Sequence, residues 1–235
     1  MSSKIFKYLA MVSVPLAIVV VMLGAYTRLG DAGLGCPDWP GCYGQIDVPE
    51  THHEIAKANQ AYPDRPVEPA KAWKEMIHRY FAGMLGLLVF AMAILAIKNR
   101  RDPQQQVAVP VFLAFWIVFQ ALLGMWTVTI KLNPTIVMAH LMGGLATLSL
   151  LFWISLRHTN ALIEKRLDLP RLNRLHMLAL VALVAVLVIQ LVLGVSNIIF
   201  SLPMAIAVSH NAVGAVLLLV MVAINHAIRP KDGVL

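Results

Sequence analysis

The chain has 235 residues, of which 59% are hydrophobic and only 13% are charged, and its mean hydropathy is +0.74. Soluble domains are roughly 45–50% apolar and about 25% charged, so this composition excludes a soluble globular protein. The net charge of +7 rests on few residues, and no nucleic-acid-binding motif accompanies it, so a nucleic-acid partner is not expected. The composition predicts an all-α polytopic membrane protein in contact with lipid.

Six apolar segments have the length of roughly 20 residues that a membrane-spanning helix needs. The segment before residue 28 is too long for a signal peptide and has no small-residue cleavage site, so we expect it to be an uncleaved first span. Asn133-Pro134 and Pro203 mark two of the turns between spans. The predicted spans are about Tyr8–Tyr26, Ile77–Ile97, Val107–Ile130, Thr135–Leu156, Leu175–Val195 and Met204–Ile228.

The distribution of basic residues predicts the orientation. Twelve of the nineteen Lys and Arg residues fall on one side if the N-terminus is cytoplasmic, whereas the short outer turns hold only Lys131. Short cytoplasmic loops carry the excess of positive charge in membrane proteins, so both termini are expected to be cytoplasmic. The predicted inner residues are Lys4, Lys7, Lys98, Arg100, Arg101, Arg157, Lys165, Arg166, Arg171, Arg174, Arg229 and Lys231.

One long stretch, from Arg28 to Lys74, is predicted to lie outside the membrane, and loops of this length are usually functional. Within it, 56–61 could form a short helix that ends before Pro63. Cys36 and Cys42 lie six residues apart in a Pro/Gly turn. In an oxidising compartment such a pair can form a disulfide, with either a structural or a redox role. A Cys/His metal site is not favoured, because the nearby histidines lack compact ligand spacing.

The second half of the chain contains an internal repeat. Gln120-Ala-Leu-Leu-Gly124 recurs as Gln190-Leu-Val-Leu-Gly194, and His140 and Gly144 recur 70 residues later as His210 and Gly214. The third and fourth spans therefore look duplicated as the fifth and sixth. A repeat of this kind predicts pseudo-symmetric sites on matching helices.

Three histidines are predicted to lie at a common depth below the outer surface: His78, His140 and His210. Imidazole is a good axial ligand for haem iron, and cofactor sites in bundles are built from facing helices. A glycine four residues after each of the last two would leave room for a flat macrocycle. The alternative is that each histidine hydrogen-bonds a neighbouring helix. The remaining histidines are expected to be interfacial or solvated: His52, His53, His158, His176 and His226.

Three further polar residues flank these positions. Glu75 lies three residues before His78, so the two share a helix face; it is either exposed at the interface or positioned to move protons and stabilise charge. Arg28 and Arg79 could extend to lipid headgroups or pair with haem propionates. Gln120 and Gln190 are expected to form interhelical hydrogen bonds rather than to touch a cofactor.

The chain resembles the haem A synthase family of bacterial and mitochondrial membranes over nearly its whole length. The matching stretches are Gly24–Gly30, Gly33–Gln45 with its cysteine pair, Glu75–Gly83, Gln120–Thr127, His140–Gly144 and Ser196–Asn211. The resemblance implies two similar four-helix bundles and oxidation of the C8 methyl group of haem O to the formyl group of haem A.

The resemblance also implies roles for individual residues. The family histidines that flank the substrate haem match His78 and His140, and the carboxylate near that haem matches Glu75. The outer-loop cysteine pair, implicated in activity, matches Cys36 and Cys42. Haem b is the implied cofactor of the second bundle, and His210 matches one of its two ligands.

The second half departs from the family pattern, which has eight spans where this chain has six. We expect a complete bundle over 1–157 that includes the outer loop 28–74, a cytoplasmic linker over 158–174, and an incomplete half bundle over 175–235. The connection 157–174 replaces two spans, so the haem O site looks complete and the haem b site half built. A compact variant, completion by another subunit, and an internal deletion all fit this pattern.

The sequence thus predicts a haem-dependent oxidoreductase of the bacterial inner membrane that acts in terminal oxidase biogenesis. No other metal is expected. A non-catalytic haem carrier in oxidase assembly and a b-type electron-transfer protein are the alternatives. The expected partners are haem O and haem A, haem O synthase, oxidase assembly factors and, as a homo-oligomer, further copies of the chain.

Overall fold

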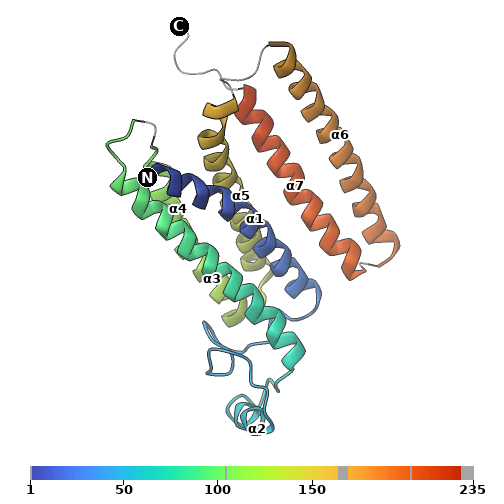
Figure 1. The fold of residues 1–235 in the computed structure, drawn as a ribbon. Coiled ribbons are helices and arrows are strands. Elements are labelled where there is room, and N and C mark those ends of the chain that lie inside the picture. Colours follow the sequence, from blue (N-terminus) through green and yellow to red (C-terminus); the bar gives the residue numbers. More distant parts are fainter. Residues whose placement is uncertain (1, 104, 164–168, 202, 229–235) are drawn as a thin grey trace.

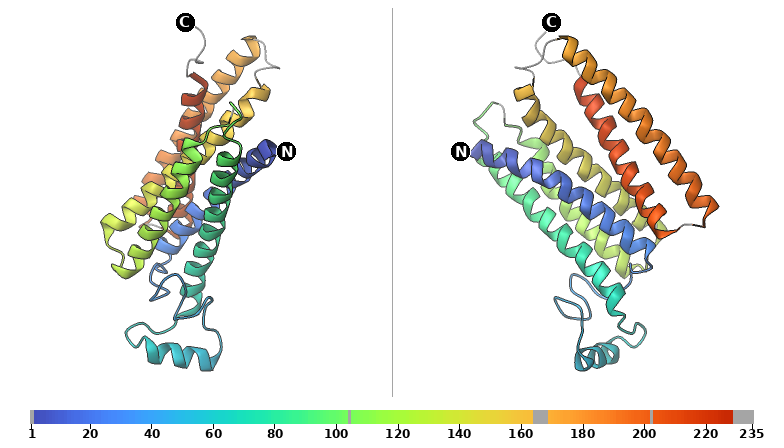
Figure 2. Two further views of the ribbon diagram at one scale, coloured as in Figure 1. Left: turned by 90° about the vertical axis from the view of Figure 1, so that its left-hand side faces the viewer. Right: turned by 45° about the vertical axis from the view of Figure 1, so that its right-hand side comes forward.

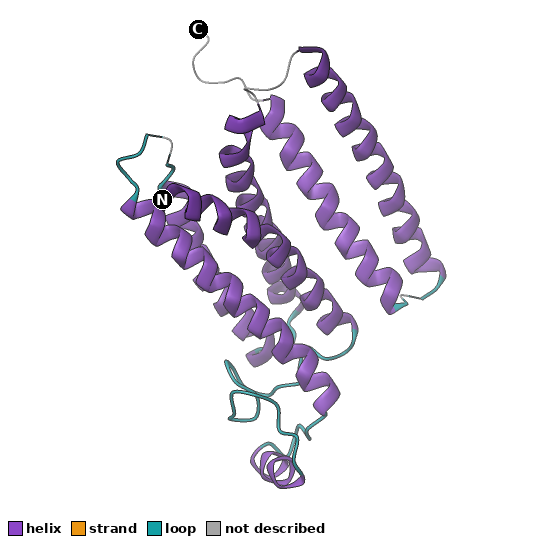
Figure 3. Cartoon of the chain, viewed as in Figure 1, coloured by secondary structure: helices purple, strands orange, loops and turns teal. Residues whose placement is uncertain are grey.

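The computed structural model describes residues 2–103, 105–163, 169–201 and 203–228. Every regular element in these ranges is a helix (Figure 3), as the composition predicted. Six of the helices are long and apolar enough to cross a membrane, and the short α2 is the exception. The helices are α1 (Ser2–Leu29), α2 (His52–Ala61), α3 (Pro69–Lys98), α4 (Ala108–Thr129), α5 (Pro134–Ile163), α6 (Leu169–Ile199) and α7 (Met204–Ile228).

Four of these helices form a closed bundle, and the last two stand beside it. Around the bundle α1 packs on α3, α3 on α4, α4 on α5, and α5 back on α1. Helix α7 packs against α1 and α5, whereas α6 packs against α7 (Figures 1 and 2). This is the predicted four-helix bundle with an additional helix pair. The boundaries at 157 and 174 stay a prediction, because α5 continues to Ile163 and α6 begins at Leu169.

The two ends of the bundle differ in character. Helix α1 begins and α7 ends at one end, while α2 and the long loop lie at the other (Figure 1). An even number of spans requires this arrangement, and the basic residues predict that the first end is cytoplasmic. The loop therefore lies on the predicted outer side.

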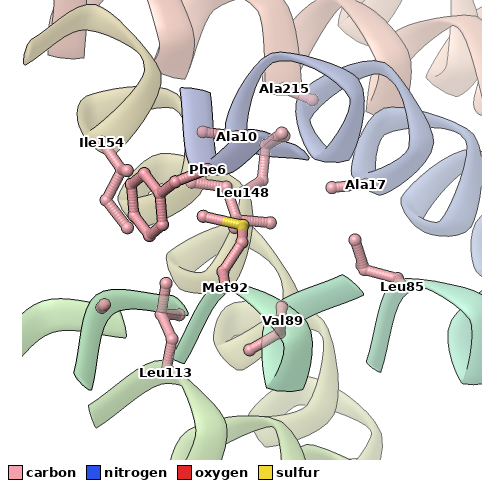
Figure 4. Packing of buried hydrophobic residues seen from close by; sticks show 12 residues of the cluster. Phe6, Ala10, Ala17, Leu85, Val89, Met92, Leu113, Leu148, Ile154 and Ala215 are labelled. Atoms are coloured by element: carbon pink, nitrogen blue, oxygen red, sulfur yellow. The ribbon is translucent and has the colours of Figure 1, made fainter. Parts of the chain in front are cut away.

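A cluster of buried apolar side chains fills the predicted cytoplasmic half of the bundle (Figure 4). Large residues such as Met92 and Leu148 alternate with alanines that let the helices approach closely, and interiors reach crystal-like density in this way. Ala215 of α7 joins the cluster. The histidines on α3 and α5 lie nearer the outer end, between this core and the loop. The buried members are Phe6, Ala10, Ala17, Leu85, Val89, Met92, Ala96, Leu113, Leu148, Leu151, Ile154 and Ala215.

The outer loop has a small core of its own, and α2 covers part of it. Buried Cys36, Cys42, Tyr43 and Ala58 of the loop pack against Met76 and its neighbours at the start of α3. The short helix expected over 56–61 is present but begins at His52. Thr51 and Glu54 form a capping box there, a signal that favours helix initiation.

Candidate functional site

The start of α3 positions the residues that the sequence singled out. Pro69 occupies the first turn, where a missing N–H costs nothing and its fixed φ suits a helix. The helix begins two turns before the apolar span predicted from Ile77. Glu75 and His78 therefore both lie within α3, which fixes the position of their backbone.

The structure brings His78 of α3 and His140 of α5 together inside the first bundle. Their ring centroids are 6.5 Å apart, and the ring planes are perpendicular. The Nδ1 atoms of both rings are buried and have no hydrogen-bond partner. Buried polar atoms are almost always paired, so the two unpaired Nδ1 atoms favour a ligand site. Each ring also interacts with the backbone of a neighbouring helix, His78 with Val20 of α1 and His140 with Gln120 of α4.

Glycines on the preceding helices make this approach possible. A Cβ placed on Gly24 of α1 would lie 3.0 Å from His78 Cε1, and one on Gly124 of α4 would lie 3.3 Å from His140 Cε1. Both distances are tighter than ordinary carbon contacts, so larger residues would push the rings away. A Cβ on Gly144 would meet nothing within 4 Å, in keeping with the space predicted beside His140. A Cβ on Gly214 would lie 3.2 Å from Gln190 Nε2, so the space predicted beside His210 is occupied by that side chain.

The pair could hold the iron of a haem between its two rings. Histidine nitrogens bind metals at about 2 Å, and the observed ring separation of 6.5 Å leaves room for a metal bond to each ring. Histidine is a common protein ligand of haem iron, and the described residues contain no cluster of three or more metal-binding side chains that would suit another metal.

Glu75 is buried rather than exposed at the interface, so that alternative is wrong. The residue is 5% exposed, and its Oε1 pairs with the Arg79 guanidinium one turn further along α3. The Cys36 amide donates a hydrogen bond of 2.9 Å to the other carboxylate oxygen. The carboxylate therefore links the α3 helix to the outer loop.

Arg79 holds the loop in place, a role that the sequence analysis missed. Besides Glu75, its Nη1 donates to the carbonyls of Asp38, Pro40 and Gly41. Neither of the roles predicted for Arg79, headgroup or propionate contact, accounts for these bonds. The spacing of four residues between Glu75 and Arg79 could have predicted their ion pair, because such residues are neighbours on a helix. Arg28 is exposed at the end of α1, and its propionate contact stays a prediction.

The predicted disulfide is confirmed: Cys36 and Cys42 are bonded, and both are fully buried. Asp38 lies between them and accepts hydrogen bonds from the amides of Tyr43 and Gly44, both 2.7 Å long. Burial raises the pKa of the Tyr43 phenol, which stays protonated and donates to the Pro66 carbonyl. The loop is thus held on the first turns of α3, beside Glu75 and Arg79. Whether its disulfide also has a redox role stays open.

The comparisons with known proteins agree with this geometry. Residues 7–188 match the family COX15-CtaA, described as cytochrome oxidase assembly protein. The chain belongs to this family. The chain is also similar to named relatives: 150 of its residues are 51% identical to the heme A synthase of Shewanella oneidensis.

The match to the Shewanella relative covers 64% of this COX15-CtaA chain and 44% of that protein. A heme A synthase of Lysinibacillus sphaericus is 32% identical over 52% of this chain and 34% of its own length. The chain thus spans less than half of the relatives it matches. Over 81 residues, 34% of its length, the chain is also 33% identical to the protoheme IX farnesyltransferase of Haloarcula marismortui, and the match covers 13% of that protein. No solved structure matches.

Family membership and the six apolar helices make this chain a multi-pass protein of the bacterial inner membrane. The third histidine that was predicted at this depth, His210 on α7, lies apart from the pair in the first bundle. It lines a cleft of about 460 Å³ between the helix pair α6–α7 and the bundle. Gln190 Nε2 lies 3.2 Å from its Nε2, so the predicted interhelical contact is confirmed for Gln190. Gln120 instead packs against Gly143, and its Nε2 has no partner.

The other histidines of this family member are not drawn into a described site. His52 and His53 are exposed on α2, as predicted. His226 is half-buried in the last turn of α7. His158 and His176 lie outside the residues whose side chains are described, so the prediction for them is not tested.

Replacing both loop cysteines by alanine is expected to destabilise the loop by about 2 kcal/mol, because a short ring restricts the unfolded chain modestly. Thermal unfolding in detergent, for the double variant and for reduced wild type, measures this. Equal stability of oxidised wild type and the double variant would show that the bond has no structural role.

Gly35→Ala is expected to lift the loop from α3. A Cβ at this position would lie 2.7 Å from the backbone carbonyl atoms of Lys71, and overpacking of this kind costs about 1–3 kcal/mol. Gly83→Ala on α3 is the matched control, since a Cβ there meets nothing within 4 Å. Protease cleavage of the loop should increase for Gly35→Ala only; equal resistance of both variants would contradict the packing described.

Proposed function

We propose that this protein oxidises the C8 methyl group of haem O to the formyl group of haem A during terminal oxidase biogenesis. The observation that carries the proposal is the facing pair His78 and His140, 6.5 Å apart with unpaired buried nitrogens. Membership of a cytochrome oxidase assembly family and relatives named heme A synthase support the same chemistry.

In this proposal His78 and His140 hold the substrate haem through its iron. Conversion of the methyl to the formyl group removes four electrons and adds one oxygen atom, so the reaction requires an external electron acceptor and an oxygen source such as water or dioxygen. The protein would supply position and electrostatics for the bound haem. The surrounding membrane accepts the farnesyl-derived tail of the substrate, in keeping with the resemblance to a protein named for farnesylating protohaem.

Glu75 is the group proposed to manage charge beside the reaction. It precedes His78 on the same helix, is buried, and is held by Arg79 and by the Cys36 amide. A carboxylate fixed in this way keeps one orientation and can exchange a proton with a neighbouring group. Its partners also tie its position to the disulfide loop, so loop closure and site geometry are coupled.

The test is pigment analysis of protein purified from cells that supply haem O but lack their own haem A synthase. The wild type is expected to contain haem A or a hydroxylated intermediate. The Glu75→Gln variant is expected to retain haem O without converting it. Bound haem O that remains unchanged in the wild type would overturn the enzyme and favour the carrier. A bound haem b without any haem O would favour electron transfer.

A further inference from the structure

The cleft between the helix pair α6–α7 and the first bundle has the properties of a ligand pocket. Its volume is about 460 Å³, and its described lining comes mainly from α5 and α7, with Val21 of α1 and Gln190 of α6. Most of these side chains are apolar. Ligand pockets in proteins have volumes of about 300–1,000 Å³ and combine apolar walls with a few polar groups. The cleft therefore suits a small, largely apolar molecule.

The cleft is open to the lipid between α5 and α6. Among the described helices, α6 packs against α7 alone, so no contact closes the side between α5 and α6 (Figures 1 and 2). Met142 of α5 lines the cleft and is nevertheless 60% exposed. A molecule dissolved in the membrane could therefore enter the cleft without passing through water.

Two polar atoms at the cleft lack partners. Nε2 of Gln190 lies 3.2 Å from Nε2 of His210. An amide nitrogen can only donate, so this imidazole nitrogen accepts and the proton of the neutral ring is on Nδ1. Nδ1 of His210 and Oε1 of Gln190 are buried without a hydrogen-bond partner. The pair thus has one donor and one acceptor left for a ligand, since buried polar atoms are almost always paired.

The other polar side chains of the described lining are engaged on their own helices. The Ser149 hydroxyl and the Asn211 amide nitrogen each donate to a carbonyl one turn earlier. The described lining contains no second histidine, and Gln190 lies against the one imidazole that it has. The cleft therefore suits a ligand that forms hydrogen bonds rather than one that binds through iron.

The cleft adjoins the histidine pair of the first bundle. His140 belongs to that pair, and the next residue of α5, Leu141, lines the cleft. On α1, the backbone of Val20 interacts with the His78 ring, and the next residue, Val21, lines the cleft. The two sites therefore lie against the same two helices, separated by about the width of one helix, roughly 10 Å. Electrons released at the first site would have a short path to the cleft.

We propose that the cleft binds the head group of a membrane quinone, and that this quinone accepts the electrons of the oxidation proposed above. A quinone carbonyl accepts the hydrogen bond of His210 Nδ1–H, and after reduction the quinol hydroxyl donates to Gln190 Oε1. The apolar tail extends between α5 and α6 into the bilayer. The electron-accepting role rests on the proposed oxidation, whereas the binding site does not.

Atoms and electrons balance with water as the oxygen source. Conversion of one methyl group and one water molecule to a formyl group releases four electrons and four protons. Two quinones, bound in succession, each take up two electrons and two protons and leave as quinols. The product quinol dissolves in the same bilayer and departs through the opening by which the quinone entered.

Equilibrium binding of decylubiquinone, a quinone with a short apolar tail, tests the site. Purified wild type in detergent is expected to bind about one quinone per chain. His210→Leu and Gln190→Leu should each weaken binding roughly 2- to 10-fold, as expected for the loss of one hydrogen bond. Unchanged affinity in both variants would overturn the proposal. A haem signal that His210→Leu alone removes would also overturn it, because iron would then occupy this place.

A matched pair of alanine variants places the quinone. Ala146 of α5 lines the cleft, so Ala146→Phe should fill it and abolish quinone binding. Ala185 of α6 is exposed and is not part of the described lining, so Ala185→Phe should bind quinone as the wild type does. An unchanged first-site haem spectrum shows that both variants are folded. Equal quinone binding by the two variants would contradict a site in this cleft.

Anaerobic oxidation of the reduced protein by decylubiquinone tests the electron path. The ferrous haem of the first site should be oxidised at a rate that saturates with quinone, and Ala146→Phe but not Ala185→Phe should lose this saturable rate. Equal rates in the two variants would overturn the electron-accepting role. A wild type that binds quinone in the cleft but converts no haem O would refute the proposed oxidation and leave the quinone site standing.

Discussion

Replacing His78 or His140 by alanine is expected to abolish haem retention in the first bundle. Each variant removes one of two axial ligands, and the adjoining faces of α1 and α4 present glycines, Gly24 and Gly124, rather than substitute ligands. The measurement is the haem-to-protein ratio and visible spectrum of purified protein in a His210→Ala background, which isolates the first site. The ratio should fall from near one haem per chain to a small residual value.

His52→Ala is the control for this experiment. His52 is an exposed histidine on α2, and its loss should leave haem content unchanged. Retention of the same spectrum by both His78→Ala and His140→Ala would show that the histidine pair does not bind haem iron, whatever the family resemblance.

Arg79→Ala is expected to be the most destabilising single change in the outer half of the protein. It leaves the Glu75 carboxylate buried without its cation and removes the donor for three loop carbonyls. Breaking one side of a buried ion pair costs about 3–5 kcal/mol. Thermal unfolding in detergent measures the loss, and protease cleavage of the loop should increase in parallel.

A double variant separates the cost of the unpaired charge from the loss of the clamp. Replacing both Glu75 and Arg79 by leucine removes the charges together, and such exchanges are often close to neutral. The double variant should therefore be more stable than Arg79→Ala, with a loop that is still released. A double variant less stable than the single one would contradict the ion-pair account.

The sequence predicted most of the membrane architecture because the features that determine it are local properties of the chain. Runs of apolar residues, the turns at Pro134 and Pro203, and the basic cytoplasmic side follow from composition along the chain. The apolar span predicted from Ile77 did not include the first two turns of α3, because Pro69–Met76 is polar for a span. Those residues pack against the outer loop, which forms hydrogen bonds with their polar side chains. A hydropathy profile contains no information about such contacts.

The sequence predicted which histidines and cysteines come together, but not the contacts that hold the outer loop in place. The histidines and the disulfide could be identified from motifs and from the repeat. The hydrogen bonds from Arg79 to the loop carbonyls depend on the path of the loop backbone. An irregular loop has no sequence periodicity from which that path could be predicted. A glycine lies beside each histidine: Gly24 beside His78, Gly124 beside His140 and Gly194 beside His210. The sequence repeat includes Gly124 and Gly194 but not Gly24, so the shared arrangement was not recognised from sequence.

The central claim is that His78 and His140 together bind the iron of one haem, and electron paramagnetic resonance of the ferric protein tests it most directly. In the His210→Ala background, the account predicts a low-spin signal typical of two imidazole ligands, which His140→Ala converts or removes. A high-spin signal in that background, or a low-spin signal that persists without His140, would contradict it.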